Sequence, residues 1–327
     1  MTSPDTLPPH GTGGTHPADG AGGTTGGGAP WSPVATRTLV HALVRTDGTV
    51  DAGELYTVAG LLGMSDQQVR LCVKRLVAEG RFTHEGRGRK AVLRAVADPL
   101  GSIAPDVGHV RLAHRQDHGL APWDGTWHLF AFAVPESARA ARDALRDTLL
   151  ALGCAPLQGG LYVAANPIEP LVEAQADHLG LASQVTCLTS TDLRVGGLAE
   201  PRALAAALWP LEEIADRHTH LAAFARCCLD RAESPEPLTD PERLALAVQL
   251  AAAFTYAMRP DPLLPPELLP RPWPGASARA LFATSWAALT ARPVSGPGPD
   301  GPGSPDPGPS GSRSPLPRLF ALYEDLG

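Results

Sequence analysis

Apolar and polar positions between residues 31 and 97 alternate with the spacing of three helices and a hairpin. Leu39 and Leu43 stand four residues apart, which predicts a helix capped by Ser32 and running to about Arg45. Asp51 is expected to cap a second helix that ends near Gly63. The third helix carries apolar residues at i, i+3, i+4, i+7 and i+8, and they are Val69, Cys72, Val73, Leu76 and Val77.

Local signals mark both ends of this third helix and the turn that follows. Ser65 with Gln68 three residues later predicts a capping box, and Gly80 ends the helix. The chain then continues as RFTHE, a glycine-bracketed GRGR turn and KAVLRAV, which predicts a β-hairpin. Three helices followed by a hairpin predict a winged helix-turn-helix domain over residues 31–97.

The middle region, residues 123–195, alternates between strand and helix signals. TWHLFAFAV is a near-continuous apolar run closed by Pro135, as in a buried strand. Ser137 is expected to cap a helix that Gly153 ends. LQGGLYVAANP then predicts a hairpin or strand, EPLVEAQADHLG a helix, and QVTCLTSTDL a strand. This order predicts a ferredoxin-like α/β sandwich, with residues 98–122 as a linker that includes or lacks a connecting helix.

Residues 196–292 have the pattern of an all-helical domain. Thr239 or Asp240 is expected to cap a long helix that Pro260 ends. The following segment, DPLLPPELLPRPWPG, is stiff and apolar, so we expect it to pack across helices. Together the three regions predict an α+β multidomain protein.

Composition changes this picture only at the ends of the chain. Gly and Pro occur 34 times each and concentrate near both ends, so disorder is expected for residues 1–30 and 293–315. A short C-terminal helix is expected for 316–327. No secretion signal and no membrane-length apolar run is evident, which favours a cytoplasmic protein that does not associate with membranes.

Charge separates one basic module from an acidic remainder. The chain carries a net charge of −7, yet residues 37–94 hold ten basic and six acidic side chains, a local +4 that leaves −11 elsewhere. A basic module on an acidic body suggests that one part binds a polyanion. A helix of about 15 residues, roughly 22 Å long, fits the major groove of B-DNA.

The expected DNA contacts divide between the third helix and the hairpin. The amide and guanidinium groups early in the helix match adenine and guanine edges, whereas the later helix and the hairpin turn suit phosphates. The expected base-reading residues are Gln67, Gln68 and Arg70, and the expected phosphate contacts are Lys74, Arg75, Arg87, Arg89 and Lys90. The alternative is a winged helix that binds protein instead of DNA.

Signals for catalysis or metal binding are weak. His114 and His118 have a zinc-compatible i, i+4 spacing but no third ligand nearby, and Asp124 has no second carboxylate in register. The five cysteines lack C-x-x-C spacing, so free core thiols are expected. We therefore expect no catalytic residues, no metal and no cofactor; the alternative from another class is a metal-dependent nuclease built on the middle domain.

Several segments together resemble the PaaX family of bacterial transcriptional repressors. The matching stretches are QVRLCVKRLVAEGRF, PWDGTWHLFAFAVPE, LGCAPLQGGLYVAANP and RPDPLLPPELLPRPWPG, in family order over about residues 37–290. The resemblance implies a homodimer that binds double-stranded operator DNA and represses a catabolic operon of the phenylacetate type. It also implies release by an aryl- or acyl-CoA effector. The chain departs from the family pattern in its Gly/Pro-rich segments and in its wing, HEGRGRKAV.

An acyl-CoA effector would need an apolar pocket and basic groups for its phosphates. A site between the middle domain and the C-terminal helices is expected. The candidate ligand residues are Trp123, Arg139, Arg142 and Arg146.

Overall fold

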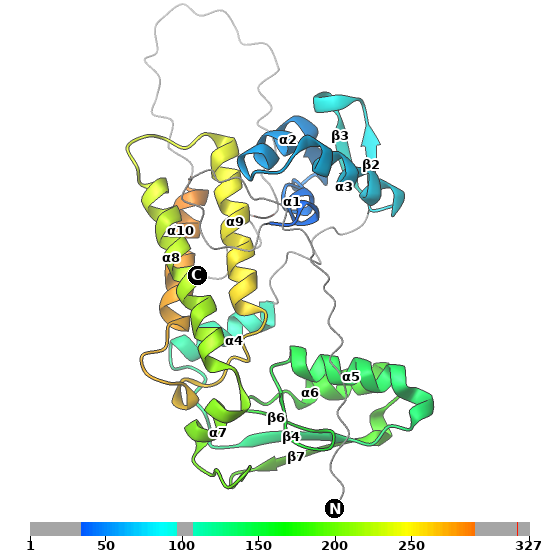
Figure 1. Ribbon diagram of the computed structural model, residues 1–327, viewed down its shortest axis with the longest axis vertical. Coiled ribbons are helices and arrows are strands. Elements are labelled where there is room, and N and C mark those ends of the chain that lie inside the picture. Colours follow the sequence, from blue (N-terminus) through cyan, green and yellow to red (C-terminus); the bar gives the residue numbers. More distant parts are fainter. Residues whose placement is uncertain (1–33, 97–106, 292–318, 320–327) are drawn as a thin grey trace, which may run out of the picture. The chain divides into compact units, whose positions relative to one another are not determined.

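The computed structural model describes residues 34–96, 107–291 and 319 (Figure 1). The chain is an α+β protein with two small antiparallel sheets and a helical C-terminal region. The segments expected to be disordered, 1–30 and 293–315, lie outside the described residues, as does nearly all of the expected C-terminal helix. Within the described ranges, no helix is both long and apolar enough to cross a bilayer.

The N-terminal region has the order α1–β1–α2–α3–β2–β3, and its three strands form one antiparallel sheet with β3 in the centre. The hairpin register pairs Phe82 with Ala95, and β1 pairs Thr49 with Arg94. The element bounds are α1 Thr36–Ala42, β1 Thr49–Asp51, α2 Ala52–Leu61, α3 Asp66–Ala78, β2 Phe82–Glu85 and β3 Val92–Ala95.

Two of the three predicted helix starts in this region are confirmed. The Asp51 carboxylate accepts a hydrogen bond from the Glu54 amide at 2.7 Å, and Ser65 forms the predicted capping box with Gln68. The start predicted at Ser32 was too early, because α1 begins at Thr36 with Ala35 as its N-cap and without a side-chain cap. The predicted end of α1 was too late, because the Arg45 amide already donates to the Thr49 carbonyl as the chain turns into β1.

The buried stripe of α3 is narrower than its periodicity predicts. Val69 and Leu76 are fully buried against α1 and α2, Cys72 and Val73 are half-buried, and Val77 is 36% exposed. The first helix contributes Leu39 and Leu43 to the same core. Burial of these side chains is the main force that fixes α3 on the module.

The middle region has a strand–helix–strand–strand–helix–strand order, with sheet order β5–β6–β4–β7 and every pairing antiparallel. LQGGLYVAANP, residues 157–167, contains the turn and the second strand, β6, of a short hairpin whose first strand, β5, lies just before it. Ser137 does not cap the first helix: it lies in a 3₁₀ turn, Glu136–Ala138, and α5 begins afterwards without a side-chain cap. Such turns are common at helix starts. The bounds are β4 Trp127–Phe132, α5 Arg139–Ala151, β5 Ala155–Pro156, β6 Leu161–Ala164, α6 Glu169–His178 and β7 Val185–Ser190.

The central strand β4 buries both of its faces. Trp127 and Leu129 pack against Trp209 and the apolar loop residue Leu264, and Phe130 packs on the α5–α6 side. The segment expected to pack across helices therefore does so, since Leu264 and Leu268 are buried between the sheet and the C-terminal helices.

Five further helices complete the described chain. One, α4, lies inside the expected linker, and the others form the C-terminal region, in which α8 packs along α9 and α10 (Figure 1). Of the two predicted caps, Thr239 is the one that caps α9, and it forms a capping box with Glu242; α9 ends just before Pro260. The bounds are α4 Val107–Asp117, α7 Pro201–Leu208, α8 Leu211–Ala232, α9 Asp240–Met258 and α10 Gly275–Thr290.

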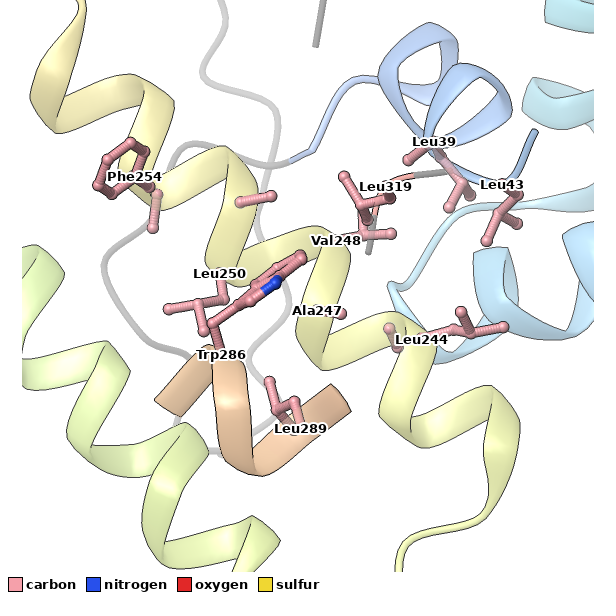
Figure 2. Packing of buried hydrophobic residues seen from close by; sticks show 14 of the residues in the cluster. Leu39, Leu43, Leu244, Ala247, Val248, Leu250, Phe254, Trp286, Leu289 and Leu319 are labelled. Carbon is pink, nitrogen blue, oxygen red and sulfur yellow. The ribbon is translucent and has the colours of Figure 1, made fainter. Parts of the chain in front are cut away.

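One apolar cluster includes residues from α1, α9, α10 and the far C-terminal part of the sequence. Figure 2 shows Leu319 beside Leu39 and Val248, and Leu319 is fully buried. Trp286 and Leu289 of α10 belong to the same cluster on the other side of α9. The N-terminal module thus shares a continuous core with the C-terminal helices.

Candidate nucleic-acid interface

The first turn of α3 is fixed by its capping box. The Gln68 side-chain oxygen accepts from the Ser65 amide at 2.7 Å, while the Gln68 amide donates to the Ser65 hydroxyl at 3.3 Å. Two amides that the helix leaves unpaired are satisfied in this way. The side-chain oxygen of Gln68 is therefore engaged in capping. The side chain of Gln67, the neighbouring residue, makes no capping hydrogen bond among the described residues.

The solvent face of α3 is polar and basic, with one apolar exception. Leu71 is 50% exposed in the middle of this face. Exposed apolar side chains can contact the thymine methyl group in a major groove, so Leu71 belongs with the candidate base contacts. All predicted residues of the helix are exposed: Gln67, Gln68, Arg70, Lys74 and Arg75.

The hairpin turn carries the other predicted residues. Arg87, Arg89 and Lys90 are all exposed, in a turn that begins at Gly86 with φ of +89°. The turn is held against α2, because the Ala52 amide donates to the Ala91 carbonyl at 3.1 Å. Its basic side chains thus project from a turn that is fixed at its base.

One contact joins the turn to the helix. Arg89 Nη2 lies 3.9 Å from Asp66 Oδ2, in the first turn of α3, with both side chains more than half exposed. An exposed pair at this distance adds little stability. It does show that the two predicted basic elements lie side by side, so one ligand can contact both.

The basic residues of this surface are largely unneutralised by acids. Among the described residues, no carboxylate lies within 4 Å of Arg70, Lys74, Arg75, Arg87 or Lys90. Glu79, the acid at the other end of α3, instead receives two hydrogen bonds from Arg37, which hold the pKa of Glu79 below its ordinary value. The surface therefore presents net positive charge, as phosphate binding requires.

The predicted effector residues are positioned differently. The Trp123 indole donates to the Thr126 carbonyl at 3.1 Å and meets Trp127 edge-on, so the half-buried ring takes part in packing. The three arginines of α5 are paired with nearby acids: Arg139 and Arg142 with Glu136 and Asp143, and Arg146 with Asp143 and Asp147. Because these acids neutralise their charge, the three arginines are weaker candidates for binding phosphates.

The described residues give no geometric support for a metal-dependent nuclease. The rings of His114 and His118 lie 4.1 Å apart, but the described part of the chain has no group of three His, Cys, Asp or Glu side chains able to hold a metal ion. Asp124 accepts from the Thr126 amide and so shapes a turn. All five cysteines are free, and Cys227 is exposed, contrary to the expectation of core thiols.

Comparison with known proteins identifies the relatives. Residues 120–205 match the family model described as PaaX protein central Cas2-like domain, and residues 209–293 match the PaaX-like protein C-terminal domain. The transcriptional repressor PaaX of Escherichia coli K12 is 28% identical over 264 residues, which are 76% of this chain and 78% of that protein.

Among solved structures, an uncharacterized protein from Mycobacterium tuberculosis, Rv0674, is 23% identical, with a TM-score of 0.45. The match covers 79% of this chain and 96% of that one. The two family models together span the middle and C-terminal regions, and the Escherichia coli relative extends the similarity over three quarters of the sequence. The chain belongs to the PaaX family.

Proposed function

We propose that this protein is a DNA-binding transcriptional repressor. Its N-terminal module, residues 31–97, acts as a winged helix-turn-helix, with α3 in the major groove and the β2–β3 turn as the wing. The observation that carries the proposal is the adjacency of two largely unneutralised basic elements, which meet where Arg89 lies 3.9 Å from Asp66. The relative named a transcriptional repressor supports the same function.

Within this proposal, each part of the surface has a separate task. Gln67, Arg70 and Leu71 read base edges, since amide, guanidinium and methyl contacts distinguish bases in the major groove. Lys74, Arg75 and the wing residues bind phosphates, which position the module without reading sequence. A homodimer would place two such modules on a palindromic operator about one helical turn apart.

The remaining regions provide assembly and response. Residues 123–195 form a ferredoxin-like domain, and residues 196–292 form the helical domain. The proposed effector is an aryl- or acyl-CoA that lowers DNA affinity, and the proposed setting is the cytoplasm. The α5 arginines are paired with acids, which makes them weaker candidates for binding the phosphates of such a ligand. Trp123 and the tryptophans around it are the candidates for binding its acyl part.

Footprinting of the full chain on DNA upstream of its own gene tests the proposal. We expect protection of a two-fold symmetric segment, and reduced protection after addition of a matching acyl-CoA from a panel. Protection that no acyl-CoA alters would contradict the effector assignment alone. Absence of protection at any site would contradict the repressor assignment itself.

A further inference from the structure

Helix α4 carries a second basic stripe that lies outside the N-terminal module. Arg111, His114 and Arg115 stand at i, i+3 and i+4, so they share one face of the helix, and His118 follows in the turn directly after it; all four are exposed. The opposite side holds Val110, Ala113 and Gln116, which are buried. The stripe is therefore the solvent face of a helix whose other face is packed.

No acid neutralises this stripe within the described residues. The one carboxylate on α4, Asp117, is paired with Arg279 of α10 at 2.6 Å. Arg111 has no carboxylate within 4 Å in the described chain, and Arg115 donates to a carbonyl, that of Leu120, at 3.2 Å. This is the reverse of α5, where every arginine of the corresponding group has a carboxylate beside it.

The helix that displays the stripe is held in place by buried polar contacts. Besides the pair with Arg279, Gln116 Nε2 donates to the Leu263 carbonyl at 2.8 Å. His109 Nε2 lies 3.2 Å from the Met258 carbonyl at the end of α9. A helix fixed at three points presents its charges in a preformed array, so binding would not have to order the helix itself.

We infer that the α4 stripe is a second phosphate-binding surface and that its partner is the backbone of the same DNA duplex that α3 reads. The inference rests on the proposed function. Exposed side chains on a helix face suit a duplex backbone, whereas small ligands are usually bound in concave pockets. The lack of acids on the stripe gives the charge complementarity that a polyanion requires.

The stripe and the N-terminal module share one apolar cluster. Val110 and Ala113, on the buried side of α4, belong to the same cluster as Val69 and Leu76 of α3. A duplex that contacts both basic surfaces would therefore meet two surfaces built on one core.

The test is a salt series of DNA affinity with the full chain and a duplex of about 60 base pairs from upstream of its gene. The variants are Arg111→Ala, Arg115→Ala and the double variant. Each lost phosphate contact is expected to lower the slope of log K against log salt by about 0.9 unit, giving a change of nearly two for the double variant. A duplex trimmed to the segment that the double variant protects should bind wild type and variant equally.

Two controls isolate the charge. Arg226→Ala removes an exposed arginine of α8 that has no carboxylate within 4 Å in the described residues, and it should leave the slope unchanged. The Arg111→Lys/Arg115→Lys double variant should retain the wild-type slope, because it keeps both charges. A fall in slope in the lysine variant equal to that of the alanine variant would overturn the inference.

The remaining outcomes are equally decisive. Wild-type DNA binding with an unchanged slope in the alanine double variant would overturn the inference and leave the proposed function intact. The same unchanged slope with weakened binding of free coenzyme A would assign the stripe to a small phosphate ligand instead. A wild-type chain that binds no DNA would contradict both proposals.

Discussion

Arg279 of α10 holds Asp117 of α4 in a two-point ion pair across 162 residues of sequence. Nη2 lies 2.6 Å from Oδ1 and Nε lies 2.7 Å from Oδ2. The two side chains are 12% and 15% exposed. The same guanidinium lies 3.6 Å from Asp261, which in turn lies 2.6 Å from the fully buried His218. This buried network fixes α4, the first described helix after the proposed DNA-binding module, to the C-terminal helices.

Loss of one partner of this pair should be costly. Asp117→Asn leaves the guanidinium without its bidentate acceptor, and we expect a loss of about 3 kcal/mol in the free energy of unfolding. Urea unfolding of the full chain measures this. The control, Arg139→Ala, breaks exposed pairs with Glu136 and Asp143 and should change that free energy by less than about 1 kcal/mol. Equal effects of the two changes would contradict the structural role given to Asp117.

Asp261 should make stability depend on pH in acid. Burial raises the pKa of Asp261, but the hydrogen bond and charge of His218 and the charge of Arg279 outweigh burial and hold that pKa below its ordinary value. The ionised carboxylate therefore stabilises the fold at neutral pH, and its contribution is lost as pH falls below about 4, the ordinary pKa, toward the lower folded value.

The Asp261→Asn variant has no carboxylate to protonate at this position. The difference in the free energy of unfolding between wild type and Asp261→Asn should therefore shrink as pH falls from 5 to 3. The measurement is the urea midpoint of both proteins across that range. A difference that stays constant with pH would show that the Asp261 carboxylate does not titrate in this window.

Local sequence signals predicted the capping boxes, whereas the buried polar network depends on contacts between residues far apart in the sequence. The Ser65–Gln68 and Thr239–Glu242 capping boxes depend on residues three positions apart, so the sequence reveals them directly. The network around Asp261 joins α4, α8 and α10, and no periodicity reports such a contact. The prediction that Ser137 caps α5 was wrong because Ser137 lies within a 3₁₀ turn, Glu136–Ala138, and α5 begins after that turn.

In the predicted interface, too, local features could be predicted from the sequence and side-chain contacts could not. Periodicity identified which side of α3 is exposed, and the turn glycines identified the β2–β3 turn. The Arg89–Asp66 contact, the exposure of Leu71 and the pairing of the α5 arginines with acids depend on side-chain placement in three dimensions. For that reason the sequence alone gave the α5 arginines as candidates for the effector phosphates, without showing that each is paired with an acid.

Gly153 should tolerate no side chain. It has φ of +86°, and an added Cβ would lie 2.8 Å from Pro262 Cα, a backbone contact that cannot move cheaply. Gly159 has φ of +55° and nothing within 4 Å, so Gly159→Ala measures the backbone strain alone. We expect Gly153→Ala to destabilise by about 1–3 kcal/mol more than Gly159→Ala in thermal or urea unfolding. Similar losses would mean that the loop at Pro262 yields to the added methyl group.

The wing provides the most direct test of the central claim, that α3 and the β2–β3 turn bind one DNA duplex. DNA affinity of wild type and of the Arg87→Ala/Arg89→Ala variant should be measured across a salt series on the footprinted upstream duplex. For wild type we expect log K to fall steeply with log salt, and for the variant we expect the slope to flatten by about one unit per lost phosphate contact. Salt-independent binding, or no DNA binding by wild type, would contradict the account.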